Sequence, residues 1–255
     1  MNRSPGLQAG DAVVVTGAAQ GIGRAIALAL ARSGAVLALW DINETGAATT
    51  AATCRDAGVK AIHARVDMSD SNAVEAAAGA ALQEYGRVFG LVSNAGIYPR
   101  ASILESTPEM WRHVLGVNLL GAVFAAKALT PSMITSKRGA IVTVASGRAL
   151  QGTPRGAHYA ASKAGIVSFT KSLALEMAPY GIRANCLIPG ITETAQPLEE
   201  FTLAELHAIG KTQVPLGRIA QPEDMTGTVL YLLSEASAFV TGQSVAVNGG
   251  TIMIP

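Results

Sequence analysis

Residues 16–23 read Thr-Gly-Ala-Ala-Gln-Gly-Ile-Gly. This glycine-rich stretch ends the strand-like run Asp11–Thr16 and leads directly into the helical pattern Arg24–Arg32. A strand, a glycine turn and a helix in this order suit pyrophosphate binding, because glycine permits close backbone approach and the helix N-terminus offers unpaired N–H groups. The spacing is GxxxGxG rather than the common GxGxxG, so a plain tight turn is the alternative for this stretch taken alone. The candidate cofactor residues of the turn are Gly17, Gln20, Gly21, Ile22 and Gly23.

Short strand-like runs alternate with longer helical patterns along the whole chain. The continuously apolar runs Val13–Val15 and Ile141–Val144 are typical of strands buried on both faces. The alternation predicts an α/β fold, a Rossmann-like doubly wound parallel sheet of about seven strands with helices on both faces. No proline- or serine-rich linker divides the chain, so we expect one domain over residues 1–255, with a candidate substrate lid at 191–210. The strand candidates are Asp11–Thr16, Val36–Trp40, Ala61–Val66, Val88–Val92, Ala140–Val144 and Ile182–Leu187.

Composition narrows the possible partners. The formal net charge of +1 gives no broad basic footprint, so we expect no nucleic-acid partner. The apolar stretch Ala25–Trp40 is interrupted before it reaches the roughly 18 residues of a membrane span, so we expect no membrane association. Cys54 and Cys186 lack partners at metal-ligand spacing, which predicts neither a disulfide nor a metal site. Because Met1–Gly10 also lacks the pattern of a secretory signal, we expect a cytoplasmic protein.

An acidic residue ends the second predicted strand. Asp41 follows the glycine turn at close to the ~20-residue offset expected for the acid that binds the adenosine ribose. Its carboxylate would accept both ribose hydroxyls and repel a 2′-phosphate, and neither Ile42 nor Asn43 supplies an arginine for that phosphate. The position therefore favours NAD over NADP, a solvated aspartate at a strand end being the alternative.

Three polar residues form a candidate catalytic group. Tyr159 and Lys163 are four residues apart in an alanine-rich stretch expected to be helical, so their side chains share one face. Ser146 follows the strand Ile141–Val144, at the carboxyl edge where open α/β sheets bind ligands. By itself a YxxxK pair is equally typical of an exposed helix face, and Ser146 is what favours a catalytic role.

From about Asp11 to Gly250 the sequence resembles the classical short-chain dehydrogenase/reductase family. Two positions depart from the family pattern: Ser93 stands where an asparagine is frequent, and Ala145 where a second serine is common. Neither affects the proton chemistry that the resemblance implies. The matching motifs are Thr16–Gly23, Asp67, Asn94-Ala95-Gly96, Asn118, Ser146 with Tyr159 and Lys163, Pro189-Gly190 with Thr194, Thr241–Gln243 and Asn248–Gly250.

The resemblance implies a role for each catalytic residue. Tyr159 is the implied general acid or base, and Lys163 is expected to lower its phenol pKa from about 10 and to bind the nicotinamide ribose. Ser146 would hydrogen-bond the substrate oxygen and stabilise its developing charge. Asn118 would link Lys163 to bulk solvent through water.

The resemblance also implies further cofactor contacts. Asp67 and Met68 would lie at the adenine ring, and Ile191 and Thr194 at the nicotinamide carboxamide. For Asp67 and Asn94 the alternative is a turn residue that caps its own backbone, and Asn118 has a similar alternative. The implied cofactor residues beyond the glycine turn and Asp41 are Asp67, Met68, Asn94, Ala95, Gly96, Tyr159, Lys163, Pro189, Gly190, Ile191 and Thr194.

The segments expected to face the substrate carry several basic residues. They follow strand ends at Ile97–Glu105, Gly147–His158 and Ile191–Gly210. An anionic substrate with a carboxylate, sulfonate or phosphate would suit such residues, the alternative being that the arginines are simply solvated. The candidate substrate residues are Arg100, Arg148, Arg155 and His158.

Three functions are compatible with the sequence. The leading one is an NAD-linked enzyme that interconverts secondary alcohols and ketones. The second is an NADPH-dependent reductase of the 3-oxoacyl-carrier-protein type, against which Asp41 argues. The third is a non-catalytic NAD-sensing protein, against which the complete catalytic group argues. By resemblance we expect a homotetramer or homodimer, and the apolar helices Gly116–Leu129 and Ala157–Ala178 suit either an interface or the core.

Overall fold

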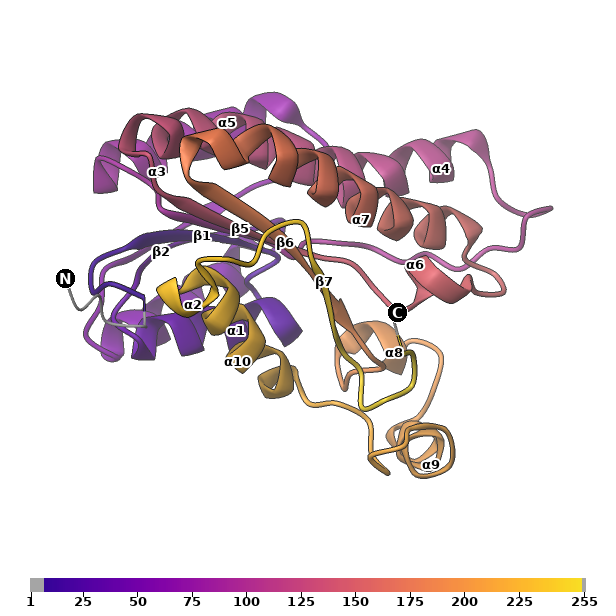
Figure 1. Cartoon of the computed structure of the whole chain (residues 1–255). Helices are drawn as coiled ribbons and strands as arrows, with labels where there is room; N and C mark the ends of the chain where they lie inside the picture. The colour runs from indigo at the N-terminus through magenta and orange to yellow at the C-terminus, as the bar shows by residue number, and fades with distance from the viewer. Residues whose placement is uncertain (1–6, 254–255) are drawn as a thin grey trace.

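A computed structural model describes residues 7–253; residues 1–6 and 254–255 of the expected domain, with most of the segment examined for a secretory signal, lie outside the described residues. Seven parallel strands form one sheet in the order β3-β2-β1-β4-β5-β6-β7 (Figure 1). This confirms the predicted doubly wound parallel sheet. The strands are β1 Ala12–Thr16, β2 Val36–Asp41, β3 Ala61–Arg65, β4 Gly90–Ser93, β5 Gly139–Val144, β6 Ile182–Pro189 and β7 Ser244–Val247.

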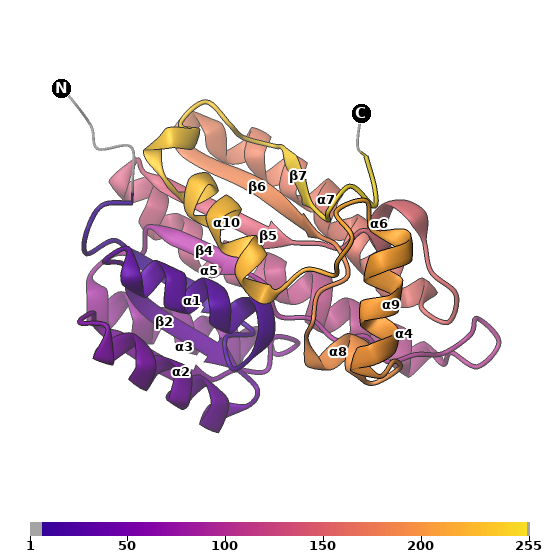
Figure 2. The same cartoon turned by 90° about the horizontal axis from the view of Figure 1, so that it is seen from below.

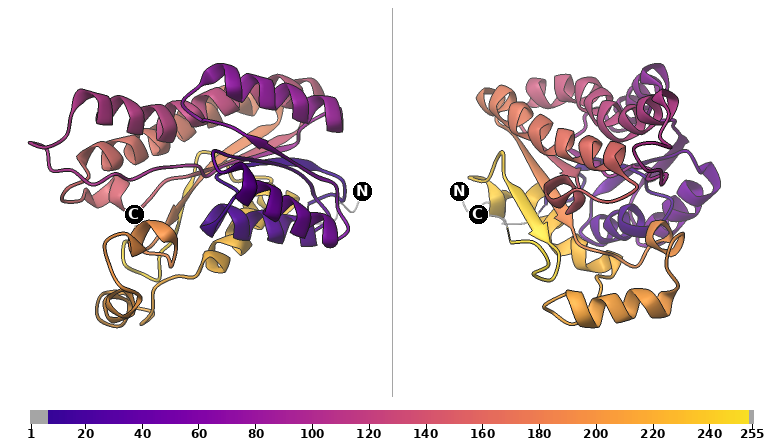
Figure 3. Two further views of the ribbon diagram at one scale, coloured as in Figure 1. Left: turned by 180° about the vertical axis from the view of Figure 1, so that it is seen from behind. Right: turned by 90° about the vertical axis from the view of Figure 1, so that its right-hand side faces the viewer.

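Helices cover both faces of the sheet. Figure 2 shows α1, α2 and α10 on one face, while α3, α5 and α7 lie on the other (Figures 1 and 3). The helices are α1 Gly21–Arg32, α2 Glu44–Asp56, α3 Ser71–Tyr85, α4 Pro108–Leu115, α5 Gly121–Ser136, α6 Arg148–Gln151, α7 Ala157–Met177, α8 Ala195–Leu198, α9 Leu203–Gln213 and α10 Thr226–Leu233. Shorter helical segments are η1 Gly116–Leu120, η2 Ala178–Tyr180, η3 Pro222–Met225 and η4 Glu235–Ser237.

Alternate side chains of β1 enter different cores, as a strand covered on both faces requires. Val13 and Val15 pack into the core that contains α1 and α10. Val14 packs into the core that contains α3 and α5. Because both faces are covered, all five residues of β1 are buried and the strand reads as a continuous apolar run.

The strand order reverses at β1. This strand pairs with β2 on one side and with β4 on the other, so the chain winds in opposite directions from this point. In open α/β sheets a crevice forms outside the carboxyl ends of the two strands at such a switch point. The glycine turn after β1 and the Asn94 turn after β4 therefore meet at one edge.

A long interrupted helix carries Asn118. It runs through α4, the π-helical turn η1 and α5, and Asn118 lies within η1. By length and composition alone Pro108–Ser136 is apolar enough to cross a membrane, but half of its most apolar window is buried inside the fold. Packing against α3 and α7 accounts for that composition.

The segment expected as a lid folds into two helices. The predicted range 191–210 contains α8 and most of α9, which continues to Gln213. Figure 3 shows these helices, in orange, standing away from the two helical layers that cover the sheet. Its role as a movable lid stays a prediction.

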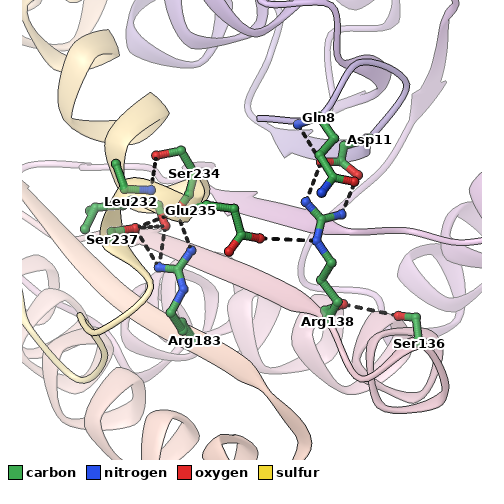
Figure 4. Close-up of polar contacts among 10 residues, drawn as sticks. Gln8, Asp11, Ser136, Arg138, Arg183, Leu232, Ser234, Glu235 and Ser237 are labelled. Atoms are coloured by element: carbon green, nitrogen blue, oxygen red, sulfur yellow. Dashed lines mark hydrogen bonds and ion pairs between the residues drawn. The ribbon is translucent and has the colours of Figure 1, made fainter. Parts of the chain in front are cut away.

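A charged network ties together the opposite, amino-terminal edge of the sheet (Figure 4). The Arg138 guanidinium donates to both carboxylate oxygens of Asp11, at 2.6 and 2.9 Å, and its Nε lies 3.5 Å from Glu235 Oε1. Arg183 donates to the carbonyl oxygens of Leu232 and Ser234 at 2.7 and 3.0 Å. These contacts hold the starts of β1, β5 and β6 together, far from the crevice.

Candidate active site

A cavity of about 610 Å³ opens at the carboxyl edge of the sheet. Its walls come mainly from α7 and from the segments that follow β4, β5, β6 and β7. The site residues predicted from the sequence that line it are Ile22, Asn94, Gly96, Arg100, Ser146, Arg148, Arg155, Tyr159, Lys163, Pro189, Gly190, Ile191 and Thr194. The other predicted residues, except His158 and Asn118, lie at the neighbouring ends of β1 to β4.

The glycine turn requires glycine at three positions. Gly17 and Gly21 have positive φ angles of 66° and 54°. A Cβ on Gly17 would lie 2.8 Å from Asn94 Nδ2, and one on Gly23 would collide with the Gly17 carbonyl oxygen. Gln20, the N-cap of α1, makes no side-chain cap, so the N-terminal N–H groups of this helix are available to a ligand. A bare backbone cradle at a helix N-terminus fits the pyrophosphate of a dinucleotide.

Asp41 is oriented by backbone groups on both sides. Its Oδ2 accepts a hydrogen bond from Ala19 N and its Oδ1 one from Asn43 N, both at 2.9 Å. Each carboxylate oxygen can accept a further bond. The half-buried carboxylate therefore stands beside the glycine turn with acceptor capacity for two hydroxyl groups.

Asp67 forms a local turn. The sequence predicts such a turn as the alternative to a contact with the cofactor. Its Oδ1 accepts from Ser69 N at 2.9 Å and from Ser69 Oγ at 2.7 Å. These hydrogen bonds hold the pKa of Asp67 below its usual value. The next residue, Met68, is buried, and its side chain leaves no room for a Cβ on Gly121 at the start of α5. Met68 thus offers its backbone rather than its side chain to the edge of the sheet.

Asn94 joins the two turns at the switch point. Its Nδ2 donates to the carbonyl oxygens of Thr16 and Gly17 at 3.1 and 3.2 Å. In return, Thr16 Oγ1 accepts from the backbone N–H groups of Asn94 and Ala95, both at 3.0 Å. Asn94 therefore shapes the glycine turn from behind, and Thr16 is a partner in this function that sequence reasoning did not single out.

Tyr159 is a deeply buried acid–base group of the cavity wall. Its side chain lines the cavity together with Ser146, and the residue is only 7% exposed. Burial raises the pKa of Tyr159, while Ser146 and the charges of Arg148 and Arg100 act in the opposite direction. Lys163 was expected to lower the pKa of Tyr159, but the pKa is raised instead, because burial outweighs the nearby charges.

Ser146 is oriented to donate a hydrogen bond. Its Oγ accepts from the backbone N–H of Arg148 at 3.2 Å. Because this contact uses a lone pair, the single hydroxyl proton stays available for an oxygen in the cavity. The role of Ser146 as a donor to a substrate oxygen stays a prediction, with which this arrangement is compatible.

Lys163 is a buried cation aimed at the same cavity. Its Nζ donates to the Val144 carbonyl oxygen at 2.9 Å and lies 5.8 Å from the centre of the Tyr159 ring. Burial lowers its pKa to about 8, since the interior solvates an ammonium poorly. A Cβ on Gly96 would approach this Nζ to 3.2 Å and Asn118 Oδ1 to 3.4 Å, so a bare backbone is needed between the two groups.

Asn118 organises the chain behind α7, the helix that carries Tyr159 and Lys163. Its Oδ1 accepts from Ile97 N at 2.8 Å, and its Nδ2 donates to Ile97 O and to Ser162 Oγ, both at 3.0 Å. The Ser162 hydroxyl in turn donates to the Tyr159 carbonyl oxygen at 2.7 Å. This position depends on the π-turn η1, a feature frequent at functional sites. The water link to Lys163 stays a prediction.

The four candidate substrate residues separate into three groups. Arg100 pairs with Glu200, and Arg155 Nη1 lies 3.0 Å from Glu105 Oε2. Arg148 lines the cavity, and among the described residues its guanidinium has neither an ion pair nor a hydrogen bond. His158 does not line the cavity: it is buried, its Nδ1 accepts from Tyr159 N at 2.8 Å, and its ring lies 5.8 Å from that of Trp111. Neighbouring helical residues point about 100° apart, and here the Tyr159 side chain lines the cavity while the His158 ring is directed towards Trp111.

Comparison with known proteins places these features in a wider group. The family model described as "Enoyl-(Acyl carrier protein) reductase" matches residues 17–251. The chain is 39% identical over 238 residues to a cis-4-hydroxycyclohexanecarboxylate dehydrogenase of Sinomonas cyclohexanicum, covering 93% of this chain and 94% of the relative. It is 34% identical to a 3-oxoacyl-(acyl-carrier-protein) reductase of Thermotoga maritima, covering 96% and 98%. A solved structure from Beutenbergia cavernae, described as a putative NAD(P)-dependent gluconate 5-dehydrogenase with NADP bound at low occupancy, superposes with a TM-score of 0.92 at 39% identity, covering 97% and 99%.

Proposed function

Because this chain belongs to the short-chain dehydrogenase/reductase family, we propose that it interconverts a secondary alcohol and a ketone with NAD(H) as its cofactor. The observation that carries the proposal is the convergence of Ser146, Tyr159 and Lys163 on one cavity. A cofactor held by the glycine turn supplies the hydride acceptor or donor. The chain's own residues supply the proton and the binding of the reacting oxygen.

Tyr159 handles the proton in either direction. During oxidation its phenolate removes the hydroxyl proton of the alcohol, and during reduction its phenol returns a proton to the oxygen of the ketone. Ser146 donates a hydrogen bond to that oxygen and stabilises the negative charge that develops on it. Lys163, charged below its pKa of about 8, suits binding of the nicotinamide ribose.

Asp41 supports NAD as the preferred cofactor. Its two oxygens each hold one backbone N–H and each keep a free lone pair, which suits the two hydroxyls of an unmodified adenosine ribose. A 2′-phosphate at the same place would meet the negative carboxylate. The glycine turn, Asp41, Asp67 and the segment 189–194 are the residues that would hold this cofactor.

One observation favours the second candidate, an NADPH-dependent ketone reductase of the 3-oxoacyl type. In the register of β2 and β3, exposed Arg65 stands directly beside Asp41, where a cation would suit a 2′-phosphate. The resemblance to the Thermotoga maritima reductase and to an NADP-bound structure points the same way. A non-catalytic NAD sensor is the least supported function, because a sensor needs no buried phenol beside a donor and a cation.

Titration with NADH and with NADPH, followed by nicotinamide fluorescence, tests the cofactor. We expect tighter binding of NADH, and in Asp41→Asn a preference reduced by about tenfold because the charge is lost while the acceptor for Ala19 N is kept. Glu44→Gln removes the same charge nearby, at the exposed start of α2, and should leave the preference intact. Tighter binding of NADPH by the unmodified protein would overturn the NAD assignment and promote the second candidate.

The proposed oligomeric state follows from the family, whereas the proposed location and the partners expected to be absent follow from the sequence. We propose a homotetramer or homodimer in the cytoplasm, without nucleic-acid or membrane partners. Exposed apolar side chains, Leu175 on α7 and Phe239 after η4, support assembly. Sedimentation of the purified protein tests the oligomeric state.

A further inference from the structure

The cavity carries more positive than negative charge. Its described lining contains four basic side chains, Arg100, Arg148, Arg155 and Lys163, and one acidic side chain, Glu200. The acid is already paired with Arg100. A substrate that enters this cavity therefore meets an excess of positive charge beside the catalytic tyrosine.

Only one of the three cavity arginines is left without an internal acceptor. Arg100 is held by Glu200 and lies over the Tyr98 ring, 4.5 Å from its centre. Arg155 is held by Glu105. Among the residues that the structure describes, the Arg148 guanidinium has no ion pair and no hydrogen bond.

Arg148 is also the arginine tied most directly to the reacting groups. It follows Ser146 by two residues, and its own backbone N–H donates to Ser146 Oγ. Its charge reaches Tyr159, where it acts to lower the phenol pKa. The pyrophosphate cradle, by contrast, is built by the glycine turn between β1 and α1, on a different strand of the sheet.

We propose that Arg148 binds a carboxylate of the substrate, so that the enzyme acts on hydroxy acids and keto acids. The guanidinium presents two parallel N–H donors that match the two oxygens of a carboxylate. With the acid held there, Ser146 and Tyr159 meet a carbinol or carbonyl carbon elsewhere in the same molecule. This assignment rests on the proposed alcohol–ketone activity and adds the substrate class to it.

Matched pairs of ketones test the inference. The probes are 4-oxocyclohexanecarboxylate with its neutral amide, and 5-oxohexanoate with its neutral amide, each reduced with saturating NADH or NADPH. We expect kcat/KM for the better acid to exceed that of its amide by at least about tenfold, and this ratio to fall about tenfold in Arg148→Gln. Arg148→Lys, which keeps the charge but loses the fork, should retain part of the ratio.

Two controls separate carboxylate binding from other effects. Arg155→Gln removes a cavity charge that Glu105 already balances, so the acid-to-amide ratio should change less than about threefold. The Kd for the reduced cofactor should be the same in Arg148→Gln as in the parent, because the contact is with substrate. Added salt should raise KM for the acid and leave KM for the amide unchanged.

The outcomes distinguish this inference from the proposed function. Equal efficiency for acid and amide, or an unchanged ratio in Arg148→Gln, overturns the role of Arg148 while alcohol–ketone activity stands. A weakened Kd for the cofactor in Arg148→Gln, with an unchanged ratio, would assign the residue to the cofactor instead. A protein that binds the cofactor but reduces none of the four ketones overturns the proposed function, and this inference with it.

Discussion

The ring of Tyr98 stacks on the ring of Tyr159, with centres 4.1 Å apart and planes inclined by 12°. The Tyr98 hydroxyl shares a hydrogen bond of 3.1 Å with Thr153 Oγ1, and the Arg100 guanidinium lies over the Tyr98 ring. The loop after β4 thus holds the Tyr159 ring in place and covers part of it from solvent.

Loss of this stack should impair turnover. In Tyr98→Leu we expect kcat/KM to fall about three- to tenfold. This range corresponds to the loss of an aromatic pair, which contributes about 0.5–1.5 kcal/mol. Tyr98→Phe keeps the stack and loses only the contact with Thr153, so steady-state kinetics should show less than about a twofold change. Equal losses in the two variants would assign the effect to the hydroxyl rather than to the stacked rings.

Tyr159→Phe removes the proton donor and keeps the ring. We expect kcat for both oxidation and reduction to fall at least about 10²-fold. The reason is that no other described group in the cavity could replace Tyr159 as the proton donor near Ser146. The Kd for NADH should stay within about threefold of the parent, as measured by fluorescence titration. Retained turnover in this variant would show that proton transfer is carried by another group.

The raised pKa of Tyr159 predicts opposite pH profiles for the two directions. Oxidation needs the phenolate, so its kcat/KM should climb by up to about tenfold per pH unit through neutrality and above. Reduction needs the phenol, so its kcat/KM should stay level over the same range and fall only at higher pH. Rates measured in both directions between about pH 6 and 10 check this, and an oxidation plateau already reached below neutrality would contradict it.

The sequence was sufficient to predict the fold, and it singled out Ser146, Tyr159 and Lys163, which the structure brings to one cavity. The paired periodicity of buried strands and amphipathic helices is a local signal, and Tyr159 and Lys163 are fixed relative to each other by one helical turn. Six strands were located in this way. The seventh, Ser244–Val247, is short and only half-buried, so its pattern carries little information.

The residues that sequence reasoning missed are those joined by long-range contacts. Tyr98 meets Tyr159 across a loop, and Ser162 meets Asn118 only because the π-turn η1 directs that amide inward. No local pattern marks such contacts. His158 was misplaced for the opposite reason, since closeness to Tyr159 in sequence does not survive the rotation of about 100° per helical residue.

The buried charge of Lys163 should lower the free energy of unfolding at neutral pH. The pKa of lysine is about 10.4 in an unfolded chain, whereas burial lowers the pKa of Lys163 in the folded protein to about 8. Below pH 8 folding must bury the charge, which costs on the order of 3 kcal/mol. Between the two pKa values the folded state releases its proton first, so this cost shrinks as pH rises.

Lys163→Met removes that cost along with activity. In urea denaturation without cofactor we expect the variant to gain stability relative to the parent at pH 7, offset by about 1 kcal/mol for the lost bond to Val144. The difference should shrink steadily towards pH 10. Lys171→Met, an exposed position on the same helix, is the control and should show no such trend. If the difference in stability between Lys163→Met and the parent did not change with pH, the buried charge of Lys163 would not be its cause.

The pair Asp11 and Arg138 should show strong coupling in stability. The Asp11 side chain is 1% exposed and its carboxylate takes both donors of the guanidinium, so Arg138→Met leaves a buried charge whose other neighbour is Gln8 N at 3.1 Å. We expect that variant to lose about 3 kcal/mol. Adding Asp11→Asn removes the charge and keeps an acceptor for Gln8, so the double variant should recover part of the loss.

A double-mutant cycle from urea denaturation measures this coupling. We expect an interaction energy above about 1.5 kcal/mol, since the two side chains share one network and are not independent. The three variants should keep the parent's kcat, because the network drawn in Figure 4 lies at the starts of β1, β5 and β6, whereas the cavity opens beyond their carboxyl ends. Additive losses would mean that Arg138 acts mainly through its other contacts, the ring of Phe89 at 4.0 Å and Glu235.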